Sequence, residues 1–391
     1  MELKRVVVTG LGALSPIGND VATTWENARN GVSGAAPITR FDASKFKTQF
    51  ACEVKDYNPA DHFDRRQMRQ LDLYAMFALT AADEAIADAG LDGEGIDKNR
   101  VGVIFAAGIG GLHTFEEEAG YFAVHGEEQG PKYNPFFIPK MIADIAAGHI
   151  SIAHEFRGPN YATVSACASS NNALIDAYNT IRLGYADAVV AGGAEAAVFP
   201  AGVGGFNSMK ALSTRNDDAK GASRPFSGSR DGFVIGEGAA ALVLEELEHA
   251  KARGAHIYAE VAGAGMKPED IDYINLHGTS TPVGDRSEAK AIVDVFGPHA
   301  YEINLSSTKS MTGHLLGAAG ALEAVLCVKT ITDGVIPPTI NHEEGDDDPE
   351  VDPRLNFTFN KAVEKNVDTV LSNTFGFGGH NAAVILKKFK G

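Results

Sequence analysis

The stretch TVSACASS at residues 163–170 joins an extended apolar run to a helical pattern, and the rest of the fold can be read outward from it. The helical spacing continues through Leu174, Ala177, Tyr178 and Ile181. This places the thiol of Cys167 at a strand-to-helix junction. Because a helix N-terminus carries unsatisfied N–H groups and partial positive charge, we expect a lowered thiol pKa and a cysteine poised for covalent chemistry. The alternative is an inert buried cysteine, which is common.

Alternating strand and helix patterns surround this junction, as in layered α/β folds. The strands predicted in the first part of the chain are residues 5–9, 101–106, 161–165, 188–191 and 238–244. An Ala-rich amphipathic helix is predicted over residues 73–89, and Gly90 suits the left-handed conformation that closes a helix.

The second part of the chain repeats the first in outline. Its predicted elements are strands at residues 257–262, 271–276 and 304–307 and an apolar helix at 318–332. Asp285 and Glu288 have the spacing of a capping box, which predicts that a helix opens there. In each part a Ser-rich strand end precedes a long helix. We therefore expect two similar halves, residues 1–253 and 254–391, with both helix starts facing one active site.

Length and composition indicate an ordinary globular protein. With 391 residues and 44% hydrophobic content, the chain can bury a large core. No apolar run is long enough to span a membrane, and the N-terminus lacks the features of a secretory signal. Cys52, Cys167 and Cys327 are widely spaced and odd in number, which argues against disulfides and a clustered metal site. We therefore expect a reduced, cytoplasmic setting and no metal.

The formal net charge of −17 argues against nucleic acids and anionic membranes as partners, because its field repels both. A basic patch must therefore be local. The candidates are Arg65, Arg66, Arg69, Lys210 and Lys132. Taken alone, these residues fit a solvated turn and helix face. The acidic run at residues 343–348 is expected to be an exposed loop without a binding role.

Two histidines lie in small, Gly- and Thr-rich segments of the second half. His277 follows the predicted strand at residues 271–276 and opens the sequence HGTST, and His314 ends the sequence KSMTGH before the last long helix. Either one alone fits a surface or satisfied interior histidine, and the chain has 12. Because such loops permit close approach of an extended ligand, we expect both histidines at a shared site.

These motifs resemble those of the elongating β-ketoacyl-acyl-carrier-protein synthases, most closely the type II enzymes of bacterial fatty acid synthesis. The resemblance runs from VVVTGLG at residues 6–12 to NTFGFGGHN at residues 373–381, so it covers essentially the whole chain. Its most specific motifs are SACA at 165–168, HGTST at 277–281, KSMTGH at 309–314 and GFGG at 376–379. It implies a thiolase-like α/β fold, in which two pseudo-symmetric βαβαβ halves form an α-β-α-β-α arrangement, normally as a homodimer.

The resemblance also implies a reaction. Cys167 would take an acyl chain as a thioester. Malonyl carrier would then lose carbon dioxide, and its carbanion equivalent would attack the thioester, so that the chain grows by two carbons. Neutral His277 and His314 would donate hydrogen bonds to the malonyl thioester oxygen as it becomes an enolate. The backbone N–H groups of Cys167 and Phe377 would stabilise the later tetrahedral oxyanion.

Lys309 and Glu323 resemble the supporting pair of this family. A carboxylate in the apolar helix at residues 318–332 is costly to bury unpaired, so we expect an ion pair or hydrogen bonds. The positive charge of Lys309 would help to keep the histidines neutral. The alternative for Glu323 is an exposed helix position.

Further positions match substrate-binding residues of relatives. Thr279 and Thr281 match residues that hydrogen-bond the phosphopantetheine arm, and Ile109 matches an acyl-pocket position that helps to set chain length. Phe377 resembles a mobile gate between the thiol and the malonyl entrance, and Phe375 lies in the same Gly-rich segment, at the substrate site. Read without the resemblance, these residues fit structural roles at strand ends and a hydrophobic anchor on a loop.

The partner implied is an acidic acyl carrier protein. The cluster of Arg65, Arg66, Arg69, Lys210 and Lys132 would then form a local docking patch on an otherwise negative enzyme. No cofactor is implied, since the substrates travel on the phosphopantetheine of the carrier.

One departure from the family matters. In relatives, the strand that corresponds to residues 257–265 is followed by a loop and an Ala-rich helix, whereas Met266 here leads directly to the next predicted strand at Ile271. Parallel strands need a crossover of about a dozen residues or more, usually helical. Either an internal segment is missing from this sequence, which we favour, or the protein is a deletion variant that lacks part of the wall beside His277. A smaller departure is His380, where many relatives carry Thr.

Three other functions compete with this interpretation. A non-catalytic ketosynthase-like partner, similar to a chain-length factor, typically loses the nucleophile, whereas Cys167 is retained here. A thiolase usually has a second cysteine near the C-terminal Gly-rich loop, and residues 375–381 contain none. Initiating synthases have a Cys-His-Asn set, and here His314 occupies the place of that Asn.

Overall fold

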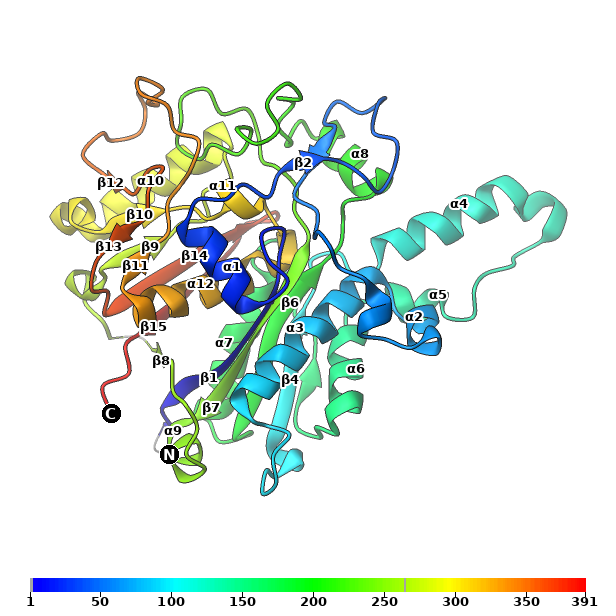
Figure 1. The fold of residues 1–391 in the computed structure, drawn as a ribbon, viewed down its shortest axis with the longest axis horizontal. Helices are drawn as coiled ribbons and strands as arrows, with labels where there is room; N and C mark the ends of the chain where they lie inside the picture. Colours follow the sequence, from blue (N-terminus) through cyan, green and yellow to red (C-terminus); the bar gives the residue numbers. More distant parts are fainter. Residues whose placement is uncertain (1–2, 264) are drawn as a thin grey trace.

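Two groups of five strands, built in the same order, form the centre of the molecule (Figure 1). The computed structural model describes residues 3–263 and 265–391. In the first group the order across the sheet is β5-β4-β6-β7-β1. These strands are β1 (Val6–Leu14), β4 (Val101–Ala106), β5 (Asn160–Tyr161), β6 (Ala188–Glu195) and β7 (Gly238–Glu246).

The second group has the order β10-β9-β14-β15-β8, and β12 (Asn356–Phe357) extends its outer edge. Its strands are β8 (Ala259–Ala262), β9 (Tyr273–Asn275), β10 (Asn304–Ser306), β14 (Thr369–Gly376) and β15 (His380–Lys387). If the strands of each group are numbered by their order along the chain, they lie across the sheet in the order third, second, fourth, fifth, first in both groups. The two first strands, β1 and β8, pair antiparallel and join the groups into one hydrogen-bonded sheet. The repeat read from the sequence is therefore present in the topology.

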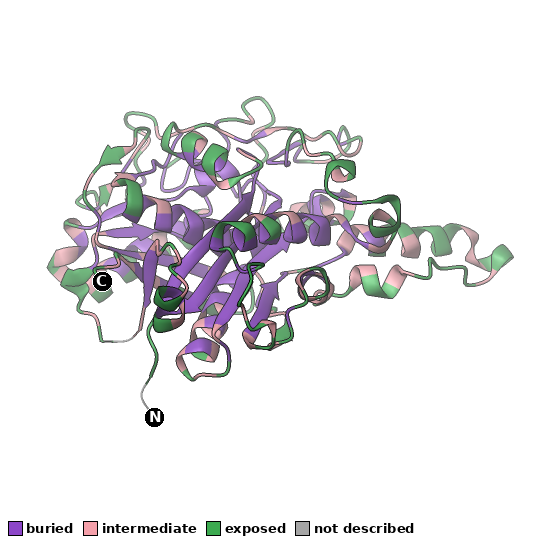
Figure 2. Cartoon of the chain, turned by 60° about the horizontal axis from the view of Figure 1, so that its bottom comes forward, coloured by how far each residue is buried: buried purple, intermediate pink, exposed green. Residues whose placement is uncertain are grey.

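Helices cover these strands in layers. α3 (Leu73–Ala89) and α6 (Ile145–His154) pack on one face of the first group, in one apolar cluster with its strands. α7 (Ser169–Arg182) and α12 (Ala319–Asp333) share a second cluster with strands of both groups, so they form the middle layer. α10 (Pro282–Phe296) packs on the outer face of the second group. This is the predicted α-β-α-β-α arrangement, and Figure 2 shows most of the strands at the centre of the molecule in the colour of buried residues.

The observed α3 matches the predicted helix at residues 73–89, and local chemistry explains both of its ends. The Asp72 side chain accepts a hydrogen bond from the N–H of Tyr74, and Gly90 adopts φ +65° after the last turn. The helix also lies very close to β1, because a Cβ atom at Gly12 would collide with the carbonyl of Ala81. Small residues on both elements therefore bring the outer helix onto the sheet.

The remaining elements are mostly short connections. They are α1 (Val21–Arg29), β2 (Ala36–Pro37), β3 (Phe50–Ala51), η1 (Pro59–Asp61), α2 (Arg65–Gln70), η2 (Lys98–Arg100), α4 (Leu112–Gln129), α5 (Phe137–Met141), α8 (Pro200–Ser208), α9 (Leu247–Ala252), η3 (Pro268–Asp270), η4 (Gly297–Tyr301), α11 (Lys309–Thr312), η5 (Leu316–Ala318), β11 (Val335–Ile336) and β13 (Val363–Glu364). Helices α4 and α5 form an arm that projects from the body, at the right of Figure 1. None of the helices in the described ranges is both long and apolar enough to cross a membrane.

The predicted strand at residues 161–165 is shortened to β5, which pairs at only two positions of β4. β5 is the outermost strand of the first group, so within the described residues its other edge has no neighbouring strand. Without a second neighbour the segment leaves the ladder early and turns toward Cys167.

The predicted capping box at Asp285 and Glu288 is wrong. α10 begins three residues earlier, at Pro282, with Thr281 as its N-cap. Both carboxylates lie inside the helix and are buried. Asp285 accepts a hydrogen bond from the N–H of Phe226, and Glu288 accepts from the backbone of the HGTST segment. The acidic spacing therefore serves tertiary contacts rather than the helix end.

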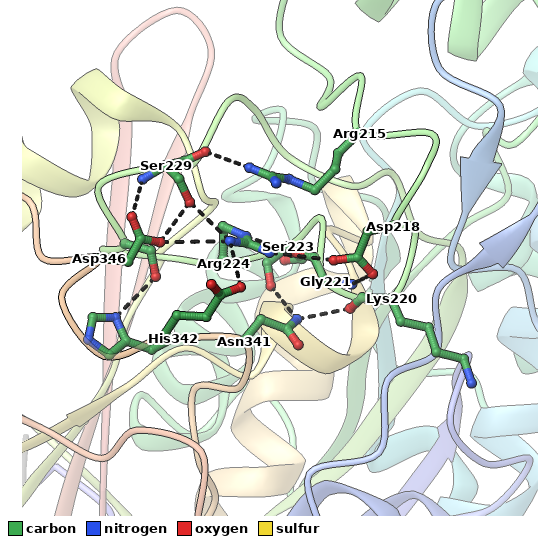
Figure 3. Close-up of polar contacts among 12 residues, drawn as sticks. Arg215, Asp218, Lys220, Gly221, Ser223, Arg224, Ser229, Asn341, His342 and Asp346 are labelled. Carbon is green, nitrogen blue, oxygen red and sulfur yellow. Dashed lines mark hydrogen bonds and ion pairs between the residues drawn. The ribbon is translucent and has the colours of Figure 1, made fainter.

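The acidic run at residues 343–348 is only partly the exposed loop that was predicted. Asp348 is buried and forms an ion pair with buried Arg230, and Asp346 lies 3.7 Å from the guanidinium of Arg224. Asp346 also accepts hydrogen bonds from the N–H and hydroxyl of Ser229. Figure 3 shows Arg224 at the centre of this network. These contacts hold the loop of the acidic run against residues 224–230.

The connection between β8 and β9 contains only η3 among its described residues. Its counterpart in the first half, between β1 and β4, contains α3, so the outer layer of the second half lacks one helix. This agrees with the short crossover noted in the sequence. Ala264 of this connection lies outside the described residues, as do Met1 and Glu2 of the N-terminal segment.

Candidate active site

Cys167 lies in a sharp turn between β5 and α7. Ala166, the residue before it, has φ +52°, which is unusual for a residue with a side chain. The Ser169 hydroxyl stabilises this turn, because it donates a hydrogen bond to the carbonyl of Ala166 and accepts one from the N–H of Ser165. α7 begins only at Ser169, so the cysteine lies two residues before the helix. The turn presents its side chain to the centre of the molecule.

The predicted lowering of the Cys167 thiol pKa is wrong, because this pKa is raised in the structure. Burial raises the pKa of the Cys167 thiol to about 11, although the charge of Lys309 and the N–H groups of Phe377 and Cys167 oppose the rise. The buried carboxylate of Glu195 contributes to the rise. The thiol is therefore protonated at neutral pH, and nucleophilic attack requires that its proton leave when the substrate binds. The other two cysteines are buried and free.

His277 and His314 lie side by side. Their ring centroids are 5.3 Å apart with an interplanar angle of 89°, and the ring of Phe375 lies 5.4 Å from that of His277. The Nδ1 atoms of both histidines are buried without a hydrogen-bond partner. His277 lies two residues after the end of β9, and His314 lies two residues after α11, where Gly313 has φ +66°. The segment after strand β9 and the segment after helix α11 thus bring both imidazoles together.

Glu288 positions the segment that carries His277, and the sequence analysis missed this role. Its carboxylate accepts hydrogen bonds from the N–H groups of His277 and Gly278, both at 2.8 Å. The hydroxyl of Ser307 donates to the carbonyl of Gly278 at 2.6 Å. The only sequence signal was a carboxylate among the apolar positions of a helix, which we interpreted as part of a cap.

Both histidines are neutral at physiological pH. Burial lowers the pKa of His277 and of His314 well below 6.5, and the positive charge of Lys309 lowers both further. Neutral imidazoles retain one N–H donor each, which is what stabilisation of a developing enolate oxygen requires.

We expect decarboxylation of a malonyl substrate to vary little between pH 8 and pH 6. A histidine with an ordinary pKa of about 6.5 would lose roughly three quarters of its neutral form at pH 6, and the rate would fall in proportion. Because both pKa values lie well below that range, the neutral fraction stays close to one. Carbon dioxide release by the Cys167→Gln variant measures this step alone. A roughly fourfold fall between pH 8 and pH 6 would contradict the assigned protonation states.

Lys309 and Glu323 form a buried ion pair, as the resemblance implied. The two side chains are almost completely inaccessible, with exposures of 2% and 3%, and Nζ of Lys309 contacts Oε1 of Glu323. Burial raises the pKa of Glu323 to about 7, whereas the lysine lowers it. The exposed helix position considered for Glu323 is therefore wrong.

Replacement of Lys309 by Ala should destabilise the protein by about 3–5 kcal/mol, because it leaves a buried carboxylate without its partner. The matched control is Lys329→Ala, which breaks the more exposed pair of Lys329 with Asp333 in the same helix and should cost less than about 1 kcal/mol. Urea denaturation of both variants measures the difference. Equal losses of unfolding free energy in the two variants would show that the buried pair stabilises the protein no more than the exposed pair does.

A cavity of 390 Å³ lies in front of these groups. Its lining residues are Cys167, Lys210, Ala211, Phe233, His277, Thr279, Thr281, Pro282, Val283, Gly284, His314, Phe375, Gly376 and Phe377. The thiol and both imidazoles therefore border one space. Lys309 and Glu323 lie behind the lining.

The GFGG segment closes the cavity next to the thiol. A Cβ atom at Gly376 would lie 2.6 Å from the carbonyl oxygen of Ser165, so only glycine permits this close approach. Phe377 is 52% exposed, and its ring lies 6.4 Å from that of Phe206. Gly378 and Gly379 have positive φ and make the tight turn into β15. His380, the departure noted in the sequence, is the exposed first residue of that strand.

The substrate-binding candidates divide into two sets. Thr279 and Thr281 line the cavity, and their hydroxyls lie 3.0 Å apart. Phe375 also lines it. Ile109 does not, since its side chain is 41% exposed in the loop after β4. Its match to an acyl-pocket position stays a prediction.

The basic candidates do not all lie on one element. Arg65, Arg66 and Arg69 belong to the short helix α2, whose N-terminus is closed by a capping box from Asp64. Lys210 lies at the mouth of the cavity, after α8. Lys132 is in the α4–α5 arm. Their joint role as a docking patch stays a prediction.

The described ranges contain no cluster of three or more His, Cys, Asp or Glu side chains that could hold a metal ion. Oxygen atoms of Asn275, Glu323 and Ser372 are nevertheless buried without a hydrogen-bond partner. The side-chain amide of Asn275 also donates a hydrogen bond to the hydroxyl of Tyr273. Oxygens of this kind suit water or a hard cation.

Comparison with known families agrees with this arrangement. The N-terminal domain of beta-ketoacyl synthases matches residues 3–250, and the C-terminal domain matches residues 234–343. The chain belongs to the beta-ketoacyl synthase family. The predicted family and the thiolase-like fold are thus confirmed.

Curated relatives resemble the chain over its full length. The 3-oxoacyl-[acyl-carrier-protein] synthase 2 of Coxiella burnetii is 46% identical over 418 positions, and that of Staphylococcus aureus N315 is 45% identical over 420. Each match covers 99% of both chains. Because this beta-ketoacyl synthase has 391 residues, the alignments are longer than the chain itself. Each relative therefore contains residues without a counterpart here.

A solved structure also resembles this ketosynthase over nearly its whole length. The complex AntDE:AntF, a type II PKS acyl-carrier protein with its ketosynthase bound to the hexaketide, contains a chain with a TM-score of 0.90 and 32% identity. The match covers 99% of this chain and all of that one.

Proposed function

We propose that this ketosynthase elongates fatty acyl chains by decarboxylative Claisen condensation with malonyl-acyl carrier protein. The observation that carries the proposal is the single cavity bordered by Cys167, His277 and His314 in a chain of this family. A thiol can hold an acyl group, and two neutral imidazoles can stabilise an enolate beside it. The relatives from Coxiella burnetii and Staphylococcus aureus described above are named 3-oxoacyl-[acyl-carrier-protein] synthase 2.

The steps follow from these residues. The Cys167 sulfur attacks the acyl thioester, the carrier thiol leaves with the proton, and the acyl group stays on the enzyme. Malonyl carrier then loses carbon dioxide while the N–H donors of His277 and His314 hold its thioester oxygen. The resulting carbanion equivalent attacks the acyl carbon, and the C–S bond to Cys167 breaks. The N–H groups of Cys167 and Phe377 stabilise the intermediate oxyanion, and Phe377 acts as the gate between the two substrates.

The partner in this proposal is an acyl carrier protein, whose phosphopantetheine brings both substrates, so that no separate cofactor takes part. Thr279 and Thr281 would bind its arm inside the cavity. Support for a carrier comes from the solved ketosynthase complex. The basic residues of α2, with Lys210 and Lys132, would attract the acidic carrier despite the net charge of −17.

A homodimer, with each chain divided into halves near residue 253, completes the proposal. The α4–α5 arm buries little of its own surface, and several large apolar side chains on it are exposed. They are Phe115, Tyr121, Phe122, Val124, Tyr133 and Ile138. Such a concentration of apolar surface favours contact with a second copy. The setting we propose is the cytoplasm.

The alternative is a non-catalytic partner subunit similar to a chain-length factor. Such a partner typically lacks the nucleophilic cysteine. This chain retains Cys167 together with Lys309 and both histidines. Incubation of the purified protein with acyl and malonyl carriers decides between the two. We expect carbon dioxide and a β-ketoacyl carrier two carbons longer than the acyl substrate. Absence of both products from the complete folded chain would contradict the catalytic function, and would favour a scaffold or a loss caused by the short β8–β9 connection.

A further inference from the structure

Glu195, the last residue of β6, is a fully buried carboxylate with an unusual set of partners. It accepts hydrogen bonds from four backbone N–H groups: at Oε2 from Gly108 at 2.8 Å and Gly317 at 3.1 Å, and at Oε1 from Ile109 at 3.1 Å and Gly110 at 3.2 Å. The ion pairs of the described ranges do not include it. Burial raises the pKa of the Glu195 carboxyl to about 7, because the four amide dipoles offset only part of the cost of burying its charge.

These amides come from two segments that meet at the active site. Gly108, Ile109 and Gly110 form the loop after β4, whereas Gly317 belongs to η5, three residues after His314. The contact leaves no room for side chains. A Cβ atom at Gly108 would lie 2.6 Å from Oε2 of Glu195, and one at Gly317 would lie 2.8 Å from the same oxygen. Glu195 thus ties a loop of the first half to the histidine segment of the second.

The same carboxylate lies near the nucleophile. Its negative charge contributes to the raised pKa of the Cys167 thiol. A Cβ atom at Gly193, two residues earlier in β6, would contact the side chain of Ser170 in the first turn of α7. The end of β6 is therefore packed between the thiol-bearing turn and the Ile109 loop.

We propose that Glu195 is a positioning residue that holds the Ile109 loop at a fixed place relative to Cys167 and thereby limits which acyl chain lengths the enzyme accepts. The loop sequence AGIGG contains three glycines, which cost more conformational entropy to order than other residues. Ile109 is 41% exposed, so packing of its side chain within this chain gives little restraint. The carboxylate supplies the restraint through three consecutive amides. This inference rests on the proposed function.

The Glu195→Gln variant tests the inference. The amide has one acceptor oxygen in place of two, and its NH₂ group opposes the N–H donors, so the loop loses part of its anchor. With acyl carriers of 8 to 18 carbons, the preference between the best and worst substrates should change by roughly tenfold. Decarboxylation of malonyl carrier should stay within about twofold of wild type. Because a negative charge is lost, iodoacetamide should also alkylate Cys167 faster at pH 8.

Glu84→Gln is the matched control, since Glu84 on α3 also accepts two backbone N–H groups, from Ala13 and Val21, but does not border the cavity. It should keep the wild-type profile. An unchanged profile in folded Glu195→Gln, or an equal loss at every chain length, would overturn the inference.

A second measurement keeps the inference testable if Glu195→Gln does not fold. In wild type, the amides of residues 108–110 should exchange with deuterium as slowly as those of β4. If they exchange as fast as the amides of the α4–α5 arm, Glu195 does not hold the loop in place and the inference is wrong. A wild type that transfers no acyl group at all would instead overturn the proposed function itself.

Discussion

Replacement of Cys167 by Gln should abolish acyl transfer and condensation, with a loss of at least about a thousandfold, while carbon dioxide release from malonyl carrier persists. The thiol sulfur is the atom that forms the covalent bond, and Cys167 is the cysteine that lines the cavity. The histidines and Lys309 remain, so the groups that stabilise the enolate are intact. Acyl transfer is measured by the mass of the enzyme after incubation with acyl carrier, and decarboxylation by carbon dioxide release.

The matched control is Cys52→Ala. Cys52 is also buried, and burial raises the pKa of its thiol to about 12, but it does not border the cavity. This variant should still gain one acyl group. If the Gln variant loses decarboxylation and acyl transfer to the same degree, the proposed division of labour between thiol and imidazoles is wrong.

His314→Ala should show the reverse pattern, with decarboxylation about 10²–10³-fold slower and acylation of Cys167 largely preserved. The side chain removed is one of two neutral donors at the cavity, and its loss leaves the developing enolate oxygen with His277 alone. Carbon dioxide release and the enzyme mass, measured on the same preparation, separate the two effects.

His149→Ala serves as the control for this variant, because His149 lies on α6 and also has a pKa lowered by burial, but does not line the cavity. We expect wild-type rates. Should His314→Ala decarboxylate malonyl carrier at the wild-type rate while it loses acylation, the imidazole would act on the thiol rather than on the enolate.

Elements with a strong local pattern could be predicted from the sequence. The helix at residues 73–89 has its predicted bounds, and the predicted helix at 318–332 is shifted by one residue, to Ala319–Asp333. Long-range contacts could not be predicted in this way. Residues 161–165 have strand composition, but β5 has no neighbouring strand on its outer edge in the part of the chain that the structure describes. The acidic run looks solvated because Arg224 and Arg230 lie more than a hundred positions away from it.

In the candidate site, too, local motifs could be predicted from the sequence and long-range contacts could not. The motifs around Cys167, His277 and His314 predict one shared site, and the three residues line one cavity. The protonation state of the thiol could not be read locally, because its pKa depends on burial and on the charges of Lys309 and Glu195. Glu195 and Glu288 were missed for a related reason. Their partners are backbone amides, which carry no residue-specific signal, and a carboxylate at an apolar strand end or helix face was the only cue.

The most direct test of the central claim, that one thiol and two imidazoles share a single reaction, is a single-turnover experiment followed by mass spectrometry. Acyl carrier should add one acyl group, located on the peptide that contains Cys167. Malonyl carrier should then remove it, with release of one carbon dioxide and one β-ketoacyl carrier per enzyme. An acyl group on another residue, or carbon dioxide released while the acyl group stays on Cys167, would contradict the account.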